Sequence, residues 1–304
     1  MTFPLAIGPE VRDALSRGQP VVALESTVFA HGLPYPRNLE AARTLDSAIR
    51  HEGAVPAAVG LLEGRAIVGL SAEQLRILTA AGVAKVSLRD LGPVLAAGSP
   101  GATTVASTAH LAARAGIRVF ATGGIGGVHR GGENSLDVSA DLTALGRTPI
   151  AVVCAGAKAI LDLPRTLEVL ETLGVPVVGI RTGEFPAFYT RESGLPLEHQ
   201  VDSAEEAARL LSAHWDVGLA TGVVLCNPPP AEAALASEDV ETWIDRAEQE
   251  AEDSGVTGKD LTPWLLARLA RLSDGKTVET NLALLEDNAR LAARVAVALS
   301  ERKA

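Results

Sequence analysis

Residues 104–124, TVASTAHLAARAGIRVFATGG, contain the pattern that decides the fold. Apolar residues recur at helical spacing over 104–115, and the short apolar run at 117–121 is typical of a buried strand. The same alternation continues in both directions along the chain. Further strands are expected at 20–24, 57–62, 84–87, 149–154, 175–180 and 222–226, and further helices at 38–51, 71–81, 163–173 and 203–215. Short apolar strands that alternate with amphipathic helices predict an α/β fold with a largely parallel sheet between helices.

Two segments depart from this alternation. Residues 60–70, GLLEGRAIVGL, have the pattern of two strands around a Glu-Gly turn, which predicts a small antiparallel addition to the sheet. After CNPPP at 226–230 the pattern is helical alone. These helices are expected at 237–252, 262–272 and 277–302. We therefore expect a three-layer α/β/α fold in a single domain over 1–304, with an α/β core over 1–230 and C-terminal helices over 231–304 packed on it.

The composition excludes several classes of protein. Of the 304 residues 47% are hydrophobic, yet no apolar run reaches the roughly 18 residues that a membrane-spanning helix needs. The net charge of −10 disfavours a nonspecific nucleic-acid binder, so any anionic ligand must meet a local basic site. Cys154 and Cys226 are the only cysteines and lie in apolar stretches, which excludes a disulfide framework. The first residues lack a secretory signal pattern, so a cytoplasmic protein is expected.

A glycine-rich segment follows the strand expected at 117–121. Residues 121–142, ATGGIGGVHRGGENSLDVSADL, hold six of the 29 glycines between Gly123 and Gly132. Such a segment permits positive φ angles and a close approach of the backbone to a ligand. Its place at the carboxyl end of the sheet is where open α/β folds bind ligands. A plain surface loop is the alternative, but the interleaved polar residues favour a site.

Three polar residues of this segment have two readings each. Asp137 and Asp141 could supply oxygen ligands to a hard divalent ion that keeps most of its waters, or they could cap a following helix. His129 could bind a metal, although a single histidine more often forms hydrogen bonds with substrate or backbone. The spacing leaves these alternatives open.

Two lysines and a glutamate lie at the ends of expected strands. Lys158, in VVCAGAKAIL, stands where desolvation disfavours an ammonium and favours an amine that can attack a carbonyl, unless its side chain reaches the surface. Lys85 has the same placement, which suggests one nucleophile and one anion binder. Glu25 follows the first strand, where a buried carboxyl can act as a general acid or can be held by neighbouring amides.

The helix expected at 104–115 begins with hydroxyl side chains. Thr103, Thr104, Ser107 and Thr108 surround its first turn. Backbone N–H groups, the helix dipole and hydroxyls there predict a phosphate site, and Lys85 would add to it. The alternative is ordinary capping by Thr103.

Long segments of the chain resemble one known family. They are ALESTVFAHGLPYPRNLE (23–40), AKVSLRDL (84–91), GATTVASTAH (101–110), the glycine-rich segment, VVCAGAKAILDLPRTLEVLETLGVPVVG (152–179) and CNPPP. In this order they are similar to the pseudouridine-5′-phosphate glycosidases of the indigoidine synthase A-like family. The similarity runs from about residue 21 to the final helix. Cys226 stands where the family often has a small residue.

The resemblance implies a reversible lyase-type cleavage of the C–C glycosidic bond of pseudouridine 5′-phosphate, giving uracil and ribose 5-phosphate. It also implies one Mn²⁺ per subunit and a homotrimer. Carried over by motif, Glu25 is the proton donor, Lys158 the nucleophile that forms a Schiff base, and Asp137 the metal ligand. The residues that would contact substrate are Lys85, Thr104, Val105, His129, Ser139, Ala140, Asp141 and Asn281. His129 is expected near the ribose and Asn281 near the base.

Three other functions compete with this interpretation. A different Schiff-base lyase acting on a phosphorylated sugar would share Lys158 and the phosphate site but would need no uracil pocket. A non-catalytic sugar-phosphate sensor would not need Glu25 and Lys158. A small-molecule kinase is disfavoured because no nucleotide-phosphate loop is recognisable. Because only 3% of residues are aromatic, we expect uracil to be recognised by amide hydrogen bonds rather than by stacking.

Overall fold

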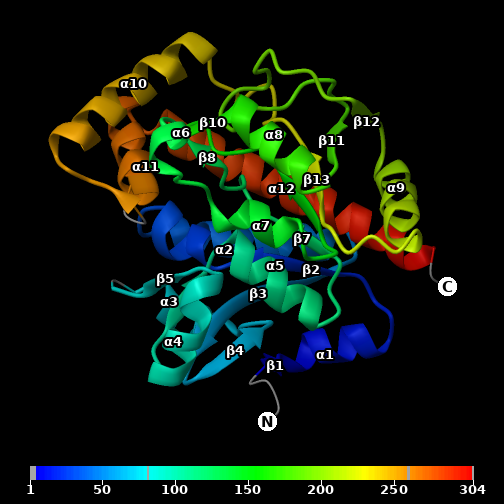
Figure 1. The fold of residues 1–304 in the computed structure, drawn as a ribbon. Coiled ribbons are helices and arrows are strands. Elements are labelled where there is room, and N and C mark those ends of the chain that lie inside the picture. The colour runs from blue at the N-terminus through cyan, green and yellow to red at the C-terminus, as the bar shows by residue number, and fades with distance from the viewer. Residues whose placement is uncertain (1–4, 81, 259–260, 303–304) are drawn as a thin grey trace.

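The computed structural model describes residues 5–80, 82–258 and 261–302 (Figure 1). Its centre is an 11-stranded sheet within these ranges, with the order β1-β4-β3-β2-β7-β9-β13-β11-β12; β6 also pairs with β3, and β5 pairs with β6. The strands are β1 (Leu5–Ile7), β2 (Val21–Glu25), β3 (Val55–Leu62), β4 (Arg65–Val68), β5 (Ala84–Val86), β6 (Gly101–Thr103), β7 (Val119–Ala121), β9 (Ala151–Cys154), β11 (Val177–Ile180), β12 (His199–Val201) and β13 (Val223–Cys226). A separate antiparallel pair consists of β8 (Val128–His129) and β10 (Leu161–Asp162).

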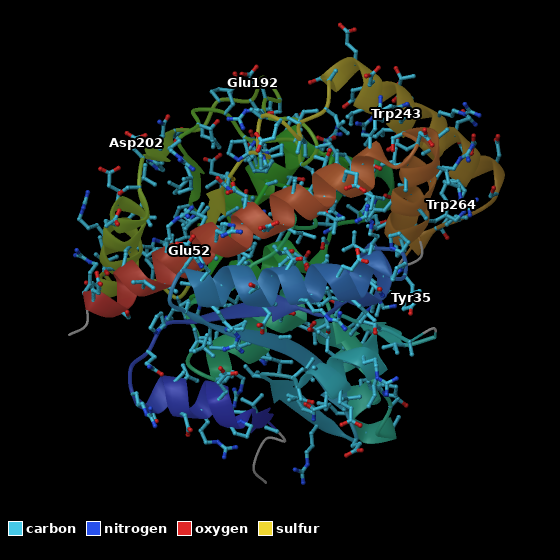
Figure 2. All side chains as sticks on the ribbon, turned by 180° about the vertical axis from the view of Figure 1, so that it is seen from behind. Tyr35, Glu52, Glu192, Asp202, Trp243 and Trp264 are labelled. Atoms are coloured by element: carbon cyan, nitrogen blue, oxygen red, sulfur yellow. The ribbon has the colours of Figure 1, made fainter. Side chains whose placement is uncertain are left out.

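Helices cover both faces of this sheet. They are α1 (Pro9–Ser16), α2 (Arg37–His51), α3 (Ala72–Leu78), α4 (Leu91–Ala97), α5 (Val105–Arg114), α6 (Gly132–Ser135), α7 (Ala140–Leu145), α8 (Leu163–Thr172), α9 (Ala204–Asp216), α10 (Ser237–Asp253), α11 (Leu261–Leu272) and α12 (Lys276–Glu301). Two short helical turns, η1 (Val28–Gly32) and η2 (Leu88–Asp90), follow β2 and β5. In Figure 1 α5 and α7 lie in front of the sheet, whereas Figure 2, seen from behind, shows α2 and α12 across the other face. The predicted three-layer fold is confirmed.

The four central strands explain why the sequence predicts the strands of the sheet so clearly. Strands β2, β7, β9 and β13 are parallel to their neighbours, and all their residues are buried. A strand buried on both faces needs apolar, often β-branched side chains along its whole length, as in AVVC and VVLC. Because these strands run in the same direction, the residues that follow them meet at one edge of the sheet.

The predicted hairpin and the C-terminal helices are also present. Strands β3 and β4 pair antiparallel, and the turn between them contains Glu63 and Gly64 with φ angles of 51° and 72°. Two positive φ angles suit the twist of a tight hairpin, although a glutamate is an unusual first member. Helix α12 contacts β2, β7 and β9 as well as α2 and α9, so it covers the centre of the sheet. None of the helices in the described ranges is both long and apolar enough to cross a membrane.

Candidate active site

A cavity of about 760 Å³ opens at the carboxyl edge of the central strands. Every site residue carried over from the family resemblance lines it: Glu25, Lys85, Thr104, Val105, His129, Asp137, Ser139, Ala140, Asp141, Lys158 and Asn281. They come from separate parts of the chain between Glu25 and Asn281, and parallel strand ends together with α12 bring them into one place. The placement agrees with the rule that open α/β sheets bind ligands at this edge.

Glu25 is the last residue of β2 and has 7% of its surface exposed. The hydroxyl of Thr122 donates a hydrogen bond to its Oε1 atom. Burial raises the pKa of Glu25 above its ordinary range, while the positive charge of Lys158 and the Thr122 hydrogen bond act against this rise. Of the two alternatives for Glu25, a raised-pKa carboxyl fits the structure better than a carboxylate held by backbone amides.

Lys158 reaches the cavity from the turn that follows β9. Its Nζ donates a 2.7 Å hydrogen bond to the carbonyl of Gly124, and its side chain is half-buried. The turn depends on Gly156, which has a φ of +77° and leaves no room for a Cβ, because one would lie 2.2 Å from the Pro186 carbonyl. The backbone therefore directs Lys158 into the cavity rather than out to the surface.

The glycine-rich segment forms a fixed wall of the cavity. Of its six glycines between 123 and 132, Gly131 has a positive φ of 73°. The others are needed mainly for close packing rather than for an unusual φ. A Cβ on Gly124 would lie 2.5 Å from Phe188, and one on Gly126 would lie 2.2 Å from the Ser139 hydroxyl. Backbone hydrogen bonds, including Ile125 N to Gly156 O at 3.0 Å, attach the segment to the chain that carries Lys158.

Asp141 binds two backbone amides rather than facing the cavity as an open ligand. Its Oδ1 accepts from Ala106 N and its Oδ2 from Gly126 N, both at 2.8 Å, and it is 6% exposed. Ser139, and not Asp141, caps the helix α7 that follows. The structure therefore resolves the alternative left open for Asp141: its carboxylate caps α5 and ties that helix to the glycine-rich segment.

The predicted phosphate site at the start of α5 needs correction. Three hydroxyls point into the protein: Thr103 donates to a carbonyl of β3 at 2.8 Å, Ser107 to a carbonyl of β5 at 2.6 Å, and Thr108 to Thr103 at 2.8 Å. All three residues are fully buried. The N-cap is Thr104 rather than Thr103, and Thr104 and Val105 line the cavity. The helix start can thus offer the Thr104 and Val105 region and Lys85 to an anion, but not the other hydroxyls.

His129 and Asp137 lie next to each other on the cavity rim. The backbone N–H of His129 donates to the Asp137 carbonyl at 3.0 Å. Burial lowers the pKa of the His129 imidazole; the charge of Asp137 opposes this effect, and Lys85 and Lys158 add to it. His129 is therefore suited to hydrogen bonding as a neutral ring. Within the described ranges no group of three or more His, Cys, Asp or Glu residues could hold a metal ion.

Asn281, on α12, presents an unsatisfied acceptor. It is 7% exposed, and its Oδ1 has no hydrogen-bond partner among the described residues. A Cβ on Gly123 would lie 3.2 Å from this atom, which places it against the glycine-rich segment. Buried acceptors are rarely left without a donor, so a ligand N–H in the cavity would complete this one.

His31, which the sequence reasoning did not place in the site, also lines the cavity. Its Nε2 lies 2.9 Å from the Val83 carbonyl, and its buried Nδ1 has no partner within the described part of the chain. The residue belongs to η1, a π-helical turn, and such turns often occur at functional sites. The motif HGLP contained the histidine, but no spacing linked it to a partner.

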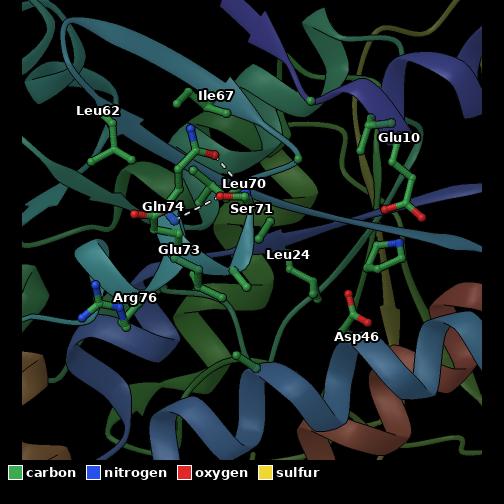
Figure 3. Close-up of a pocket in the computed structure, with 18 of the residues that line it drawn as sticks. Glu10, Leu24, Asp46, Leu62, Ile67, Leu70, Ser71, Glu73, Gln74 and Arg76 are labelled. Carbon is green, nitrogen blue, oxygen red and sulfur yellow. Dashed lines mark hydrogen bonds between the residues drawn. The ribbon is translucent and has the colours of Figure 1, made fainter.

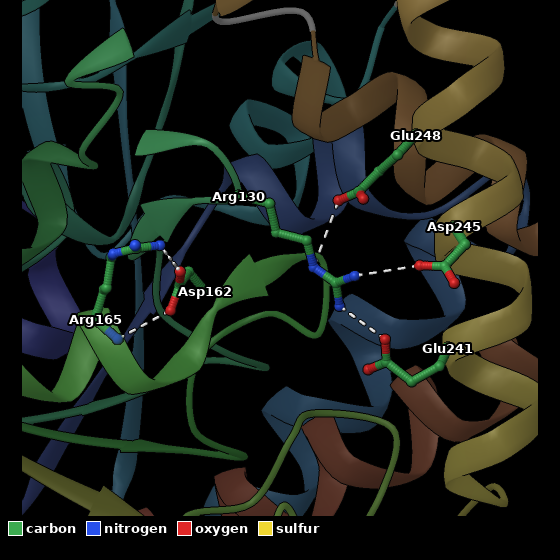
Figure 4. A network of polar contacts seen from close by, with 6 residues as sticks. All are labelled: Arg130, Asp162, Arg165, Glu241, Asp245 and Glu248. Carbon is green, nitrogen blue, oxygen red and sulfur yellow. Dashed lines mark hydrogen bonds and ion pairs between the residues drawn. The ribbon is translucent and has the colours of Figure 1, made fainter. Parts of the chain in front are cut away.

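Arg130 explains part of the polar density of the glycine-rich segment. Its guanidinium forms ion pairs with three carboxylates on α10, Glu241 at 3.0 Å, Asp245 at 3.4 Å and Glu248 at 3.6 Å (Figure 4). Thr257 and Gly258 after α10, and Thr262, Pro263 and Leu266 of α11, line the same cavity. Arg130 therefore attaches α10 to the glycine-rich segment, which forms the opposite wall of the cavity.

A larger hollow of about 1,420 Å³ lies between α2, α3 and the edge strands (Figure 3). Apolar side chains such as Leu62, Ile67 and Leu70 line it, and Arg50 forms ion pairs with Glu10 and Asp46. None of the expected site residues is among those that line it. Size alone is a poor guide here, and the smaller cavity is the candidate active site.

Comparisons with known proteins agree on one family. The family model described as "Indigoidine synthase A like protein" matches residues 10–298. A pseudouridine-5′-phosphate glycosidase from Herpetosiphon aurantiacus is 55% identical over 296 residues, covering 97% of this chain and 98% of the relative. One from Caldanaerobacter subterraneus subsp. tengcongensis is 51% identical over 296 residues, covering 97% and 96%.

Two solved structures have the same fold as this chain. The prealnumycin C-glycosynthase AlnA in complex with ribulose 5-phosphate superposes with a TM-score of 0.92 at 40% identity, covering 100% of this chain and 99% of that one. An indigoidine synthase A-like protein from Thermotoga maritima gives a TM-score of 0.90 at 38% identity, covering 98% and 97%.

Proposed function

The chain belongs to the indigoidine synthase A-like protein family, and on this premise we propose that it cleaves the C–C glycosidic bond of pseudouridine 5′-phosphate reversibly. The products are uracil and ribose 5-phosphate, so the enzyme acts as a glycosidase through lyase-type chemistry. Relatives that carry this glycosidase name match nearly the whole length of the chain. The C-glycosynthase neighbour, which holds ribulose 5-phosphate, supports a phosphorylated sugar as the ligand class.

One observation carries the proposal: a buried carboxyl of raised pKa and a lysine occupy the same cavity. The positive charge of Lys158 is close enough to act on the pKa of Glu25, and both residues line the 760 Å³ space. An ordinary glycosidase uses two carboxylates and a leaving group that departs on a heteroatom. Here the leaving atom is carbon, which is a poor leaving group. An acid can open the sugar ring, and an amine can then supply the electron pair that expels the carbon.

The proposed reaction begins with the opening of the ribose ring. Glu25 gives its proton to the ring oxygen, and the bond between that oxygen and C1′ breaks as electrons from the uracil ring form an exocyclic double bond to C1′. The amine of Lys158 then adds to C1′ of this conjugated system. Burial favours the protonated form of Glu25, because it raises the pKa of this carboxyl.

Uracil leaves in the second half of the reaction. Its C5 carbon takes up a proton, the C1′–C5 bond breaks, and the lone pair of the Lys158 nitrogen forms the C=N bond of an iminium ion. Water hydrolyses the iminium to the aldehyde of ribose 5-phosphate and returns the free amine. A lysine is required because a carboxylate could not supply this electron pair.

The remaining residues would hold the two ends of the substrate. Lys85, Thr104 and the backbone at Val105 would bind the phosphate, and residues 139–141 and His129 would contact the sugar. The unsatisfied Oδ1 of Asn281 suits an imide N–H of uracil, since the pyrimidine edge offers such donors. Fixing both ends keeps the opened sugar in place and contributes through orientation.

The same resemblance implies Mn²⁺, and the donor set suits a largely hydrated ion. Asp137 would hold the metal, because both oxygens of Asp141 already accept backbone amides. When bound, such an ion supplies positive charge that orients phosphate and hydroxyl oxygens. No step of the mechanism above passes through it.

The reverse reaction separates this function from that of other Schiff-base lyases. Incubation of the protein with uracil, ribose 5-phosphate and Mn²⁺ should produce pseudouridine 5′-phosphate, detected by mass spectrometry and by its C-glycosidic proton signals. An aldolase-type lyase would consume the sugar without incorporating uracil. A protein that binds ribose 5-phosphate but forms no product in either direction would instead be a sensor, and the proposal would be wrong.

A further inference from the structure

A chain of buried side-chain hydrogen bonds ends at Glu25. Asn227 Nδ2 donates to Asn288 Oδ1 at 3.0 Å, and Asn288 Nδ2 donates to the Thr122 carbonyl at 2.8 Å. The Thr122 hydroxyl then donates to Glu25 Oε1. Exposure is 3% for Asn227, 0% for Asn288 and 2% for Thr122. This series of hydrogen bonds connects the CNPPP motif, α12 and the residue after β7 to the cavity.

Asp287 determines the direction in which these bonds run. Its carboxylate accepts from Asn227 Nδ2 at 2.7 Å, and a carboxylate offers only acceptors. The atom of Asn227 that faces Asp287 and Asn288 must therefore be the amide nitrogen. Asn288 must in turn present its oxygen to Asn227, which leaves its own amide nitrogen facing the Thr122 carbonyl. One acceptor thus fixes the orientation of both asparagine side chains.

Thr122 is consequently fixed on both sides of its backbone. Its N–H donates to the Val153 carbonyl at 3.0 Å, and its carbonyl accepts from Asn288. With the backbone fixed in this way, the hydroxyl has one carboxyl oxygen within reach. A hydroxyl that donates to Oε1 is compatible with Glu25 in both protonation states only if the proton resides on Oε2.

We propose that Thr122, Asn288 and Asn227 are positioning residues that hold the Glu25 carboxyl with Oε1 as acceptor and Oε2 as the oxygen that carries the proton. When the O–H bond on Oε2 breaks, the proton passes to the substrate oxygen and the electron pair stays on the carboxyl. The Thr122 hydroxyl then stabilises the new carboxylate through a charge-assisted bond. This inference rests on the proposed role of Glu25 as proton donor, and it gives Asn227 of the CNPPP motif a part in the chemistry.

The Glu25 carboxyl can be titrated without any turnover. In infrared difference spectra the C=O band of protonated Glu25 is identified by its loss in Glu25→Gln. The other charged groups that face this carboxyl are Lys158, Lys85 and Asp141, and all three remain in each variant below. Changes in the titration therefore report on the Thr122 chain.

Thr122→Val removes the donor at nearly constant shape. Loss of one hydrogen bond to a charged group should raise the pKa of Glu25 by about one to two units and lower kcat about 10- to 100-fold, with a smaller effect on KM. The pH at which activity falls, as Glu25 loses its proton, should move up by the same amount. Thr122→Ser should restore most of both effects, and Asn288→Leu should shift the titration in the same direction by less.

Thr277→Val is the matched control, since Thr277 is 2% exposed, bonds to Ser273 and does not line the cavity. It should leave the Glu25 titration at its wild-type position. A Thr122→Val titration that coincides with wild type would overturn the inference even if the enzyme turns over as proposed. If Thr122→Val shifts the Glu25 titration but the wild-type protein has no glycosidase activity, the positioning role of Thr122 stands and the proposed function is wrong.

The wild-type band provides a test that does not depend on folding of a variant. A carbonyl that accepts a hydrogen bond absorbs at lower wavenumber than a buried carbonyl without a donor. If Oε1 accepts from Thr122, the protonated Glu25 band should lie at the lower position. A band at the position of an unbonded carboxyl would contradict the arrangement.

Discussion

Lys158 and Glu25 are held in the cavity in different ways, and each leads to its own prediction. Replacing Lys158 with alanine should lower kcat by about 10⁴-fold or more, because the proposed mechanism needs its amine to donate an electron pair to C1′. Borohydride added with ribose 5-phosphate should leave one covalent adduct on Lys158, located by peptide mass spectrometry. The exposed Lys276 provides the control, and Lys276→Ala should retain both turnover and the adduct. An adduct on any other lysine would reject the assignment.

Glu25 should make stability depend on pH in a sense opposite to that of a surface carboxylate. Its pKa is raised by burial, so the folded protein binds the proton more tightly than the unfolded chain does. Its contribution is fully present below the unfolded pKa and is lost as pH rises through the folded one. Glu25→Gln should therefore gain thermal stability over wild type as the pH is raised from 4 to 9. Calorimetry should show this, with exposed Glu168→Gln as control; a constant difference would contradict it.

At the residue scale the sequence predicts which groups line the cavity but not the direction in which their side chains point. Glu25, Lys158 and Asn281 line one cavity as expected. The sequence predicts Thr103, Ser107 and Thr108 in a phosphate site. Their hydroxyls instead donate hydrogen bonds to carbonyls of β3 and β5 and, for Thr108, to Thr103. Spacing along a helix shows which residues share its first turn, whereas the direction of a hydroxyl depends on distant carbonyls. For the same reason no local pattern linked Asn288 to Thr122, which lies 166 residues away.

At the scale of elements, Asp141 connects α5, α7 and the glycine-rich segment. Asp141→Asn would keep one acceptor and place an amide nitrogen against the other backbone N–H. We expect a loss of about 1–3 kcal/mol in the free energy of unfolding, measured in urea, because one buried donor loses its partner. Asp13→Asn, at an exposed position of α1, should change stability little. A similar loss in both variants would show that the two amide contacts of Asp141 are not the cause.

Arg130 attaches the outer wall of the cavity. Arg130→Gln should lower the free energy of unfolding by about 1 kcal/mol, since three partly exposed ion pairs are lost together. It should also speed proteolysis between α10 and α11. Arg165, which pairs with Asp162 on a single turn of α8, provides a matched control, and Arg165→Gln should leave the cleavage rate unchanged. Equal cleavage rates in both variants would exclude a special role for Arg130.

The same scale shows which elements the chain makes easy to predict. The central strands and the long helices were expected within a few residues of their observed bounds. Strands β1, β6 and β12 are not predicted, because each has three residues and none stands in a recognisable strand pattern such as that of residues 117–121 around β7. The glycines between 123 and 132 predict a close approach of the backbone to other groups, and the structure shows such contacts. What they approach, Phe188 and Ser139 among others, depends on packing that spacing cannot show.

At the scale of the whole molecule, the family resemblance leads us to expect a homotrimer. Light scattering after size-exclusion chromatography should give three times the 31.4 kDa mass of one chain. The result should hold with and without ribose 5-phosphate if assembly precedes substrate binding. A mass of one or two chains over the working concentration range would contradict the expectation.

Because α12 is the last helix of the chain, the ribosome makes most residues of the cavity before it makes this helix. The ribosome produces Glu25, Lys85 and Lys158 first, and the helix that carries Asn281 and Asn288 emerges about ten seconds after Lys158 at ordinary elongation rates. In the folded protein α12 packs across β2, β7 and β9, and Asn288 of this helix binds the Thr122 carbonyl. The cavity that holds Glu25 and Lys158 is therefore complete only once the last helix of the chain has docked.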